Sequence, residues 1–282
     1  MPSLLAERTE QELNPRQAAQ AGGRRVGTER AGRARAARWT RGIIGIVALA
    51  VVWQLAPTYG LVDPYFVSPL SDVGVAWWEM LTTGKLWEHL SASLVRSAGG
   101  FFLAVAVAIP LGTAIAWFPP VRQLVSPVLE LFRNTAALAL LPVFVLVLGI
   151  GETSKVAIVL YACFFPILLT TISGVESVDK QLLRSARVLG LSSATTFRKV
   201  VFPAALPTIF TGIRIAGAAA ILVLIAAEMI GATAGLGYLI NYSQYNFLIP
   251  QMYAAILTTT ALGLAVNYGL VALERRFSRW RA

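Results

Sequence analysis

Long apolar segments separated by short polar ones recur along the chain after residue 41. A helix needs about 20 residues to cross the hydrocarbon core of a bilayer, and most of these segments approach that length. The pattern predicts spans at 42–56, 98–118, 135–150, 156–174, 208–230 and 251–273. The first and third are short, so flanking residues must extend them or the bilayer must thin around them. The predicted fold class is therefore all-α, a polytopic membrane protein of about six transmembrane helices.

Composition supports this prediction. Of the 282 residues, 56% are hydrophobic and only 13% are charged, and the mean hydropathy is +0.67. A soluble domain of this size cannot hide so much apolar surface in one core. Lipid is therefore expected to be the solvent for most of the chain.

The first 41 residues differ from the rest. They are rich in Arg, Ala, Gly, Glu and Gln and contain almost no large apolar residue after Leu13, so they cannot bury enough surface to fold alone. We expect a disordered Arg-rich cytoplasmic tail over 1–41 and a transmembrane domain over 42–282. The arginines of the tail suit attraction to anionic lipid headgroups.

The placement of the basic residues predicts the orientation. Cytoplasmic flanks of membrane helices hold an excess of Lys and Arg, and with the amino terminus inside, 21 of the 24 positive residues fall on one side. The exceptions are Lys85, Arg96 and Lys155. Both termini are then cytoplasmic, and the net charge of +10 is explained without nucleic-acid binding.

The segment before the second span carries a shorter pattern. Apolar residues between Ser71 and Leu81 predict a short helix on the outer face, capped by Ser71 or Asp72.

The inner loop 175–207 is longer than a simple connection requires. We expect a first short helix from an Asp179 cap to Leu189, ended by Gly190 in a left-handed conformation. A second should run from a cap at Ser192 or Ser193 to Phe202, where Pro203 ends it.

The first short helix is amphipathic. Its apolar residues share one face and form a ridge: Leu182, Leu183, Ala186 and Leu189. Such a ridge suits a helix resting on lipid, and it equally suits a knob that docks in a groove of a soluble partner. Amphipathicity alone leaves both interpretations open.

The residue string through this loop adds a resemblance. Ser185, Ala186 and Gly190 are followed after nine residues by Val200-Val201-Phe202-Pro203. This resembles the signature loop of binding-protein-dependent ABC importer permeases, which reads Glu-Ala-Ala, three residues, Gly, nine residues, Ile, one residue, Leu-Pro. The spacing matches throughout. Arg184 stands where the family most often has Glu, which removes one acidic partner for the ATPase.

Further segments resemble the branch of that family that serves sulfonates, taurine and nitrate. They are GIGETSK at 149–155, FFPIL at 164–168, VFPAALP at 201–207, GIRIA at 212–216 and AAEMIGATAGLGYLI at 226–240. The resemblance implies a type I importer permease in a bacterial inner membrane that moves a small anion. It also implies a homodimer of permeases, two ATP-binding subunits and an extracytoplasmic solute-binding protein.

Candidate functional residues follow from this resemblance. The ATPase-coupling residues would be Leu182, Leu183, Arg184, Ser185, Ala186, Arg187, Leu189, Gly190 and Pro203. Independently of the resemblance, Glu228 and Asn267 are candidate path or gate residues, because a polar group in an apolar span is costly unless it serves a purpose. For Asn267, a hydrogen bond between helices is equally consistent with the sequence. For Glu228, a cap or interface role near the headgroups is equally consistent with the sequence.

No catalytic or cofactor site is expected. The sequence contains no phosphate-cradling Gly-Lys-Ser/Thr loop, so ATP would be hydrolysed by a separate subunit. The single cysteine, Cys163, lies in an apolar span and is expected to be a small buried hydrophobe. With one histidine, His89, a metal site or a membrane-embedded enzyme is disfavoured. The main alternative is a self-contained secondary transporter or channel, which should show more polar residues at mid-membrane depth.

Overall fold

The computed structural model describes residues 42–277, and these divide after Pro64 into two compact units. Every regular element in the described residues is helical, which confirms the all-α prediction. In the first unit most residues of the apolar helix Gly42–Thr58 are exposed. The predicted tail, residues 1–41, lies outside the described residues.

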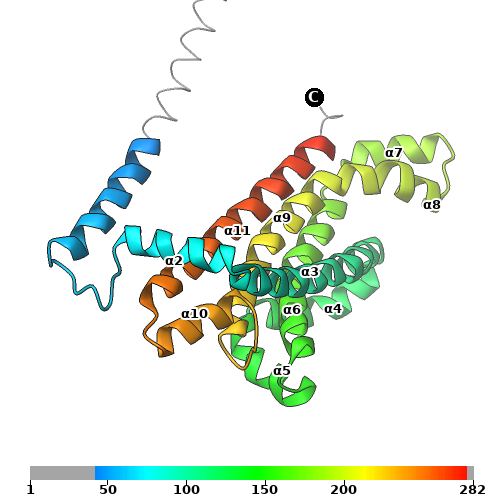
Figure 1. Ribbon diagram of the computed structural model, residues 1–282. Helices are drawn as coiled ribbons and strands as arrows, with labels where there is room; N and C mark the ends of the chain where they lie inside the picture. Colours follow the sequence, from blue (N-terminus) through cyan, green and yellow to red (C-terminus); the bar gives the residue numbers. More distant parts are fainter. Residues whose placement is uncertain (1–41, 278–282) are drawn as a thin grey trace, which may run out of the picture. The chain divides into compact units, whose positions relative to one another are not determined.

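The second unit contains the remaining helices (Figure 1). In chain order they are α2 (Leu70–Thr82), α3 (Lys85–Trp117), α4 (Pro119–Arg133), a 3₁₀ turn (Ala137–Leu140), α5 (Leu141–Leu148), α6 (Glu152–Glu176), α7 (Lys180–Val188), α8 (Ser193–Thr196), a π turn (Phe197–Val201), α9 (Phe202–Glu228), α10 (Leu236–Tyr245) and α11 (Ile249–Phe277).

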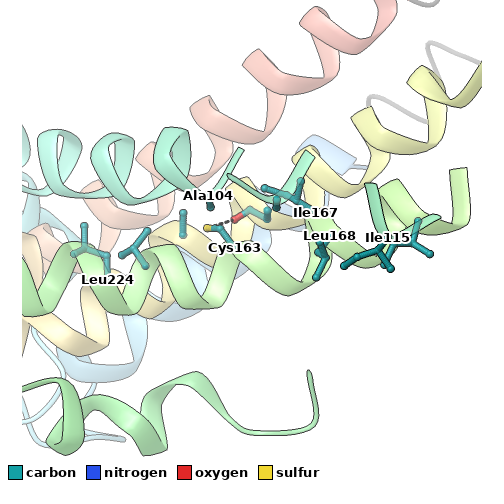
Figure 2. Packing of buried hydrophobic residues seen from close by; sticks show 11 residues of the cluster. Ala104, Ile115, Cys163, Ile167, Leu168 and Leu224 are labelled. Atoms are coloured by element: carbon teal, nitrogen blue, oxygen red, sulfur yellow. Dashed lines mark hydrogen bonds between the residues drawn. The ribbon is translucent and has the colours of Figure 1, made fainter. Parts of the chain in front are cut away.

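Helices α3, α6 and α9 form the core of this unit. Their shared apolar cluster combines small residues, such as Ala104 and Ala216, with larger ones such as Ile167 and Leu168, all fully buried. Figure 2 shows these side chains meeting between the three helices, with the Cys163 thiol 3.3 Å from the carbonyl oxygen of Ala216. Cys163 is fully buried, which confirms its expected role as a small hydrophobe. The small residues let the backbones of the three helices approach one another closely.

The closest approach of α3 to α6 gives a matched pair of substitutions. A Cβ on Gly100 would lie 2.7 Å from the Val159 side chain and 2.8 Å from the Val156 carbonyl oxygen, whereas one on Gly99 would meet only a methyl group at 3.9 Å. We expect Gly100→Ala to lower the free energy of unfolding by about 1–3 kcal/mol through overpacking. Gly99→Ala should raise it by about 0.5–1 kcal/mol, because alanine favours a helix. Thermal unfolding of the two purified variants in detergent checks whether the unfolding midpoint falls for Gly100→Ala and rises for Gly99→Ala. Equal shifts of the midpoint would contradict this packing.

The predicted spans correspond to helices of unequal length. Four helices in the described residues are long and apolar enough to cross a membrane: α3, α6, the continuous helix Ser193–Glu228, and α11. The predicted span 135–150 is instead a short helical segment, which forms a pair with α4 bent by 87°. The prediction of about six spans thus corresponds to four full spans, one bent pair and the short helix Gly42–Thr58.

Two expectations for the region before residue 98 were wrong. The helix expected to begin at Ala98 begins at Lys85, so Arg96 lies within α3 rather than in a loop. The helix expected near Ser71 is present as α2, but its N-cap position is Pro69 and no side chain caps it. The Ser71 hydroxyl instead donates to Asp72, at 3.1 Å. The sequence misplaced both starts because polar residues in an exposed helical turn do not mark its boundary.

The second unit has two distinct ends. Helices α7 and α8 lie at the same end as the last turns of α11, and α5 and α10 lie at the opposite end (Figure 1). We call these the α7 end and the α10 end. Since α11 is long enough to span a membrane, the two ends suit opposite faces of a bilayer.

Candidate functional site

Helix α7 forms the sequence-predicted coupling element at the α7 end. The Asp179 carboxylate accepts a hydrogen bond of 2.7 Å from the backbone N–H of Gln181 and so caps the helix. Gly190 follows the helix with φ 69°, the left-handed conformation expected of its stop. Both predicted boundaries of this helix are confirmed to within one residue.

The second predicted helix is only partly correct. Ser192 caps it, accepting from the N–H of Thr195 at 3.3 Å. It does not end at Pro203, however, because a π turn over Phe197–Val201 joins α8 to α9 in one continuous helix. Pro203 lies in the first turn of α9, directly after the π turn. Its missing N–H costs little there, since the hydrogen-bond register is already changing from i−5 to i−4.

The predicted apolar ridge of α7 is divided between two faces. Ala186 is buried, and Leu183 packs against the cluster that contains Val175, Val178 and Val201. This correction follows from the short connection to α6, which brings α7 back onto the bundle. Leu183 and Ala186 therefore anchor α7 rather than face a partner.

The exposed side of α7 combines three aliphatic side chains with basic and polar ones. Leu182 is 49% exposed, Val188 88% and Leu189 74%. The side chains of Arg184, Ser185 and Arg187 are also exposed. We call Leu182, Val188 and Leu189 the α7 knob. A small aliphatic projection on a well-anchored helix suits insertion into a groove of another protein.

A buried polar cluster occupies the α10 end and includes Glu228. The Glu228 side chain is fully buried at the last residue of α9. Its carboxylate accepts hydrogen bonds from the Ser93 hydroxyl at 2.8 and 2.9 Å, from Arg96 at 2.8 Å and from the N–H of Gly237 at 3.0 Å. A carboxylate removed from water in this way must keep such partners, because an unpaired buried charge is very costly.

Arg96 joins three segments in this cluster. One terminal nitrogen bonds both Glu228 and, at 2.6 Å, the carbonyl oxygen of Ala234. The other terminal nitrogen bonds the Glu152 carboxylate at 2.6 Å, and Nε bonds the second oxygen of the same group. The Arg96 side chain is only 4% exposed, whereas that of Glu152 is 66% exposed. The guanidinium thus bridges a buried and a surface carboxylate with bidentate geometry on the surface one.

The second candidate path or gate residue does not join this cluster. Asn267 lies on α11 with a partly exposed side chain, while α9 and α11 are linked near the α7 end by the Arg214–Glu274 ion pair at 3.2 Å. Glu228 and Asn267, the two candidate path or gate residues, thus lie in separate parts of the fold.

Sequence reasoning did not identify Ser93 and Arg96 as partners of Glu228, nor Glu152 as a partner of Arg96, nor Lys155 as a donor to the Gly231 carbonyl oxygen. A usable signal was present, because Arg96, Glu152, Lys155 and Glu228 occur in largely apolar helices, and isolated charges there must find partners. The described residues contain no group of three or more His, Cys, Asp or Glu side chains that could hold a metal ion.

The fold and these two sites define a class: a multi-helix membrane protein with an anchored amphipathic helix protruding at one end. Residues 100–279 match the family described as the binding-protein-dependent transport system inner membrane component, and the chain belongs to that family. It is thus the transmembrane permease subunit of an ABC transporter. Membership implies partnership with ATP-binding subunits and a binding protein.

Individual relatives agree with this assignment. The chain is 37% identical to the taurine transport system permease protein TauC of Escherichia coli (strain K12), over 84% of this chain and 88% of that protein. It is 30% identical to the putative aliphatic sulfonates transport permease protein SsuC of Bacillus subtilis (strain 168), over 86% and 88%. An inward-facing structure of the MetNI methionine ABC transporter shares the fold, with a TM-score of 0.57 and 18% identity over 66% of this chain and 93% of that one.

Proposed function

We propose that this chain is the permease subunit of an ATP-driven importer for a small sulfonate-type anion in a bacterial inner membrane. It works as a homodimer with two separate ATP-binding subunits and an extracytoplasmic solute-binding protein. The α7 end and both chain termini face the cytoplasm, and the α10 end faces the solute-binding protein. The solute class rests on the taurine and sulfonate relatives.

The observation that carries the coupling proposal is the anchored α7 knob. Leu183 and Ala186 fix α7 to the bundle, so a force on its exposed face is transmitted to α6 and α9 rather than absorbed by a loose loop. Leu182, Val188 and Leu189 then insert into a groove of the ATP-binding subunit. Arg184 and Arg187 border this contact and suit a partner groove with an acidic rim.

A substitution at the knob tests this function. In proteoliposomes that contain the permease, its ATP-binding subunit and its solute-binding protein, Leu189→Asp should weaken association with the ATP-binding subunit about 30-fold, because a charge replaces a buried aliphatic contact. Taurine uptake and receptor-stimulated ATP hydrolysis should fall together. Co-purification on a tag carried by the permease measures association, and radiolabelled taurine measures uptake.

Leu189→Met is the matched control, since it keeps the apolar volume and should retain association and uptake. Unchanged association for Leu189→Asp would overturn the role of the knob. Taurine uptake that persists without the ATP-binding subunit or without ATP would overturn the importer function in favour of a self-contained transporter.

A further inference from the structure

The segment between α9 and α10 is held through its backbone rather than through its side chains. Five backbone groups from Gly231 to Gly237 form hydrogen bonds with side chains of α3, α6 and α9. The carbonyl oxygens of Gly231 and Ala234 accept from Lys155 and Arg96, respectively. The N–H groups of Gly235, Leu236 and Gly237 donate to His89, Ser93 and Glu228, respectively. The segment is therefore fixed to α3, α6 and α9 at once.

Glu228 and Ser93 serve as external caps for α10. The first N–H groups of a helix lack partners within it, and Gly235, at the N-cap position, has no side chain to supply them. The Ser93 hydroxyl accepts from Leu236 N–H at 2.8 Å, and the Glu228 carboxylate accepts from Gly237 N–H. The negative charge of Glu228 also lies beside the amino-terminal end of α10, where the helix dipole is positive, and this interaction is favourable.

Two glycines allow this close approach. Gly235 has φ 120°, and a Cβ there would overlap the Glu228 carboxylate. A Cβ on Gly237 would overlap the carbonyl oxygen of Ile225 in α9. The start of α10 is thus pressed against the end of α9 with the carboxylate enclosed between them.

The formal charges of the cluster balance locally. Arg96 and Lys155 supply two positive charges, and Glu152 and Glu228 supply two negative ones. Lys155 is 3% exposed and donates to the carbonyl oxygens of Gly151 and Gly231, at 3.1 and 3.2 Å. Neutralising Glu228 therefore leaves the buried Arg96 with the surface carboxylate alone and removes the charge that caps α10.

We propose that Glu228 and Arg96 form an electrostatic latch that positions segment 231–237 and α10 against α3, and that the charge of Glu228 closes it. The role of the latch in transport rests on the proposed function, because in that proposal the α10 end contacts the solute-binding protein. It gives Glu228 a positioning role, in place of direct contact with the solute. With the latch closed, α10 presents Tyr242 and Tyr245, which are both exposed, in a fixed arrangement, and the exposed Phe247 follows directly after the helix.

A cysteine-accessibility experiment tests the latch without transport. Ser243 in α10 is fully buried, and its hydroxyl has no hydrogen-bond partner among the described residues, so Ser243→Cys is a nearly isosteric reporter. Native Cys163 is fully buried in the α3–α6–α9 core and serves as the internal control for folding. Labelling by N-ethylmaleimide is followed by mass spectrometry of the two cysteine peptides from the purified full-length protein.

With Glu228 intact, both thiols should be labelled slowly. In Glu228→Gln the reporter should react at least about tenfold faster while Cys163 stays protected, because local opening of α10 becomes easier without loss of the core. Glu152→Gln is the matched control: it removes an exposed carboxylate from the same arginine but leaves Glu228 in place, and should change the reporter rate less than about threefold. A reporter that stays protected in Glu228→Gln overturns the latch.

A second variant keeps the test decisive if Glu228→Gln exposes both thiols. Ser93→Ala removes one donor to Glu228 and the acceptor for Leu236 N–H without leaving an unpaired charge. Selective labelling of the reporter in Ser93→Ala supports the latch, and protection of the reporter, or equal labelling of both thiols, overturns it.

Transport assays separate this inference from the proposed function. If both are correct, Glu228→Gln should raise the concentration of loaded solute-binding protein needed for half-maximal ATP hydrolysis by about tenfold while maximal hydrolysis changes little. Selective labelling in a protein that shows no ATP-dependent uptake even with Glu228 intact would uphold the latch and refute the importer. Normal ATP-dependent uptake together with no faster labelling in Glu228→Gln would uphold the importer and refute the latch.

Discussion

Arg96→Met is expected to lower the free energy of unfolding strongly. Among the described residues, Arg96 has the only side-chain cation that bonds Glu228 directly, so the substitution leaves that fully buried carboxylate with hydrogen bonds from Ser93 and Gly237 alone. Breaking a buried ion pair by deleting one partner costs about 3–5 kcal/mol. The midpoint of thermal unfolding in detergent, followed by tryptophan fluorescence, should fall accordingly.

The second arginine–glutamate pair that links two long helices provides the control. Arg214 and Glu274 are 3.2 Å apart, but their side chains are 39% and 23% exposed. Arg214→Met should therefore cost no more than about 1 kcal/mol. The double variant Arg96→Met/Glu228→Leu should be more stable than Arg96→Met alone, since it no longer buries a carboxylate without its arginine. Equal loss of stability in Arg96→Met and Arg214→Met would contradict the view that burial makes the Arg96–Glu228 pair important. A double variant no more stable than Arg96→Met would contradict it as well.

The apolar pattern starts the second span at 98, whereas α3 begins at Lys85 and contains Arg96. Apolar runs identify where a helix must be buried in lipid, and they correctly located the middle of α3, α6, α9 and α11. They do not report the polar turns that extend such helices, and Lys85–Ser97 forms more than three turns of this kind in α3. Helix α4 was missed for a related reason, because Pro119, Pro120 and Pro127 resemble a loop, although all three are accommodated in the helix.

The two sites differed in how far the sequence could predict them. The α7 element depends on local signals, a carboxylate cap and a glycine stop within twelve residues, and these were identified correctly. The burial pattern of α7 was not predicted correctly, since spacing shows which residues share a face but not which face packs against the bundle. The Glu228 cluster depends on residues up to 135 positions apart in the chain, so one sequence could indicate that Glu228 needs a partner but not which one.

The left-handed turn at the end of α7 leads to the prediction with the largest effect on activity. Gly190 has φ 69°, and its N–H donates to the carbonyl oxygen of Arg187 at 3.0 Å. Proline fixes φ near −65° and has no N–H to donate. Gly190→Pro must therefore refold the turn that orients the α7 knob toward the ATP-binding subunit in the proposed complex.

We expect Gly190→Pro to lower receptor-stimulated ATP hydrolysis and taurine uptake by at least about 100-fold, because a misplaced contact loses both association and transmission of force. The transmembrane helices should be unaffected, since a Cβ at Gly190 meets no atom within 4 Å and the residue is exposed. Gly190→Asn is the matched control, as asparagine tolerates the left-handed conformation and should keep most of the activity. Normal yield and thermal stability together with lost coupling would place the defect in the turn; full coupling in Gly190→Pro would show that the orientation of α7 does not matter for transport.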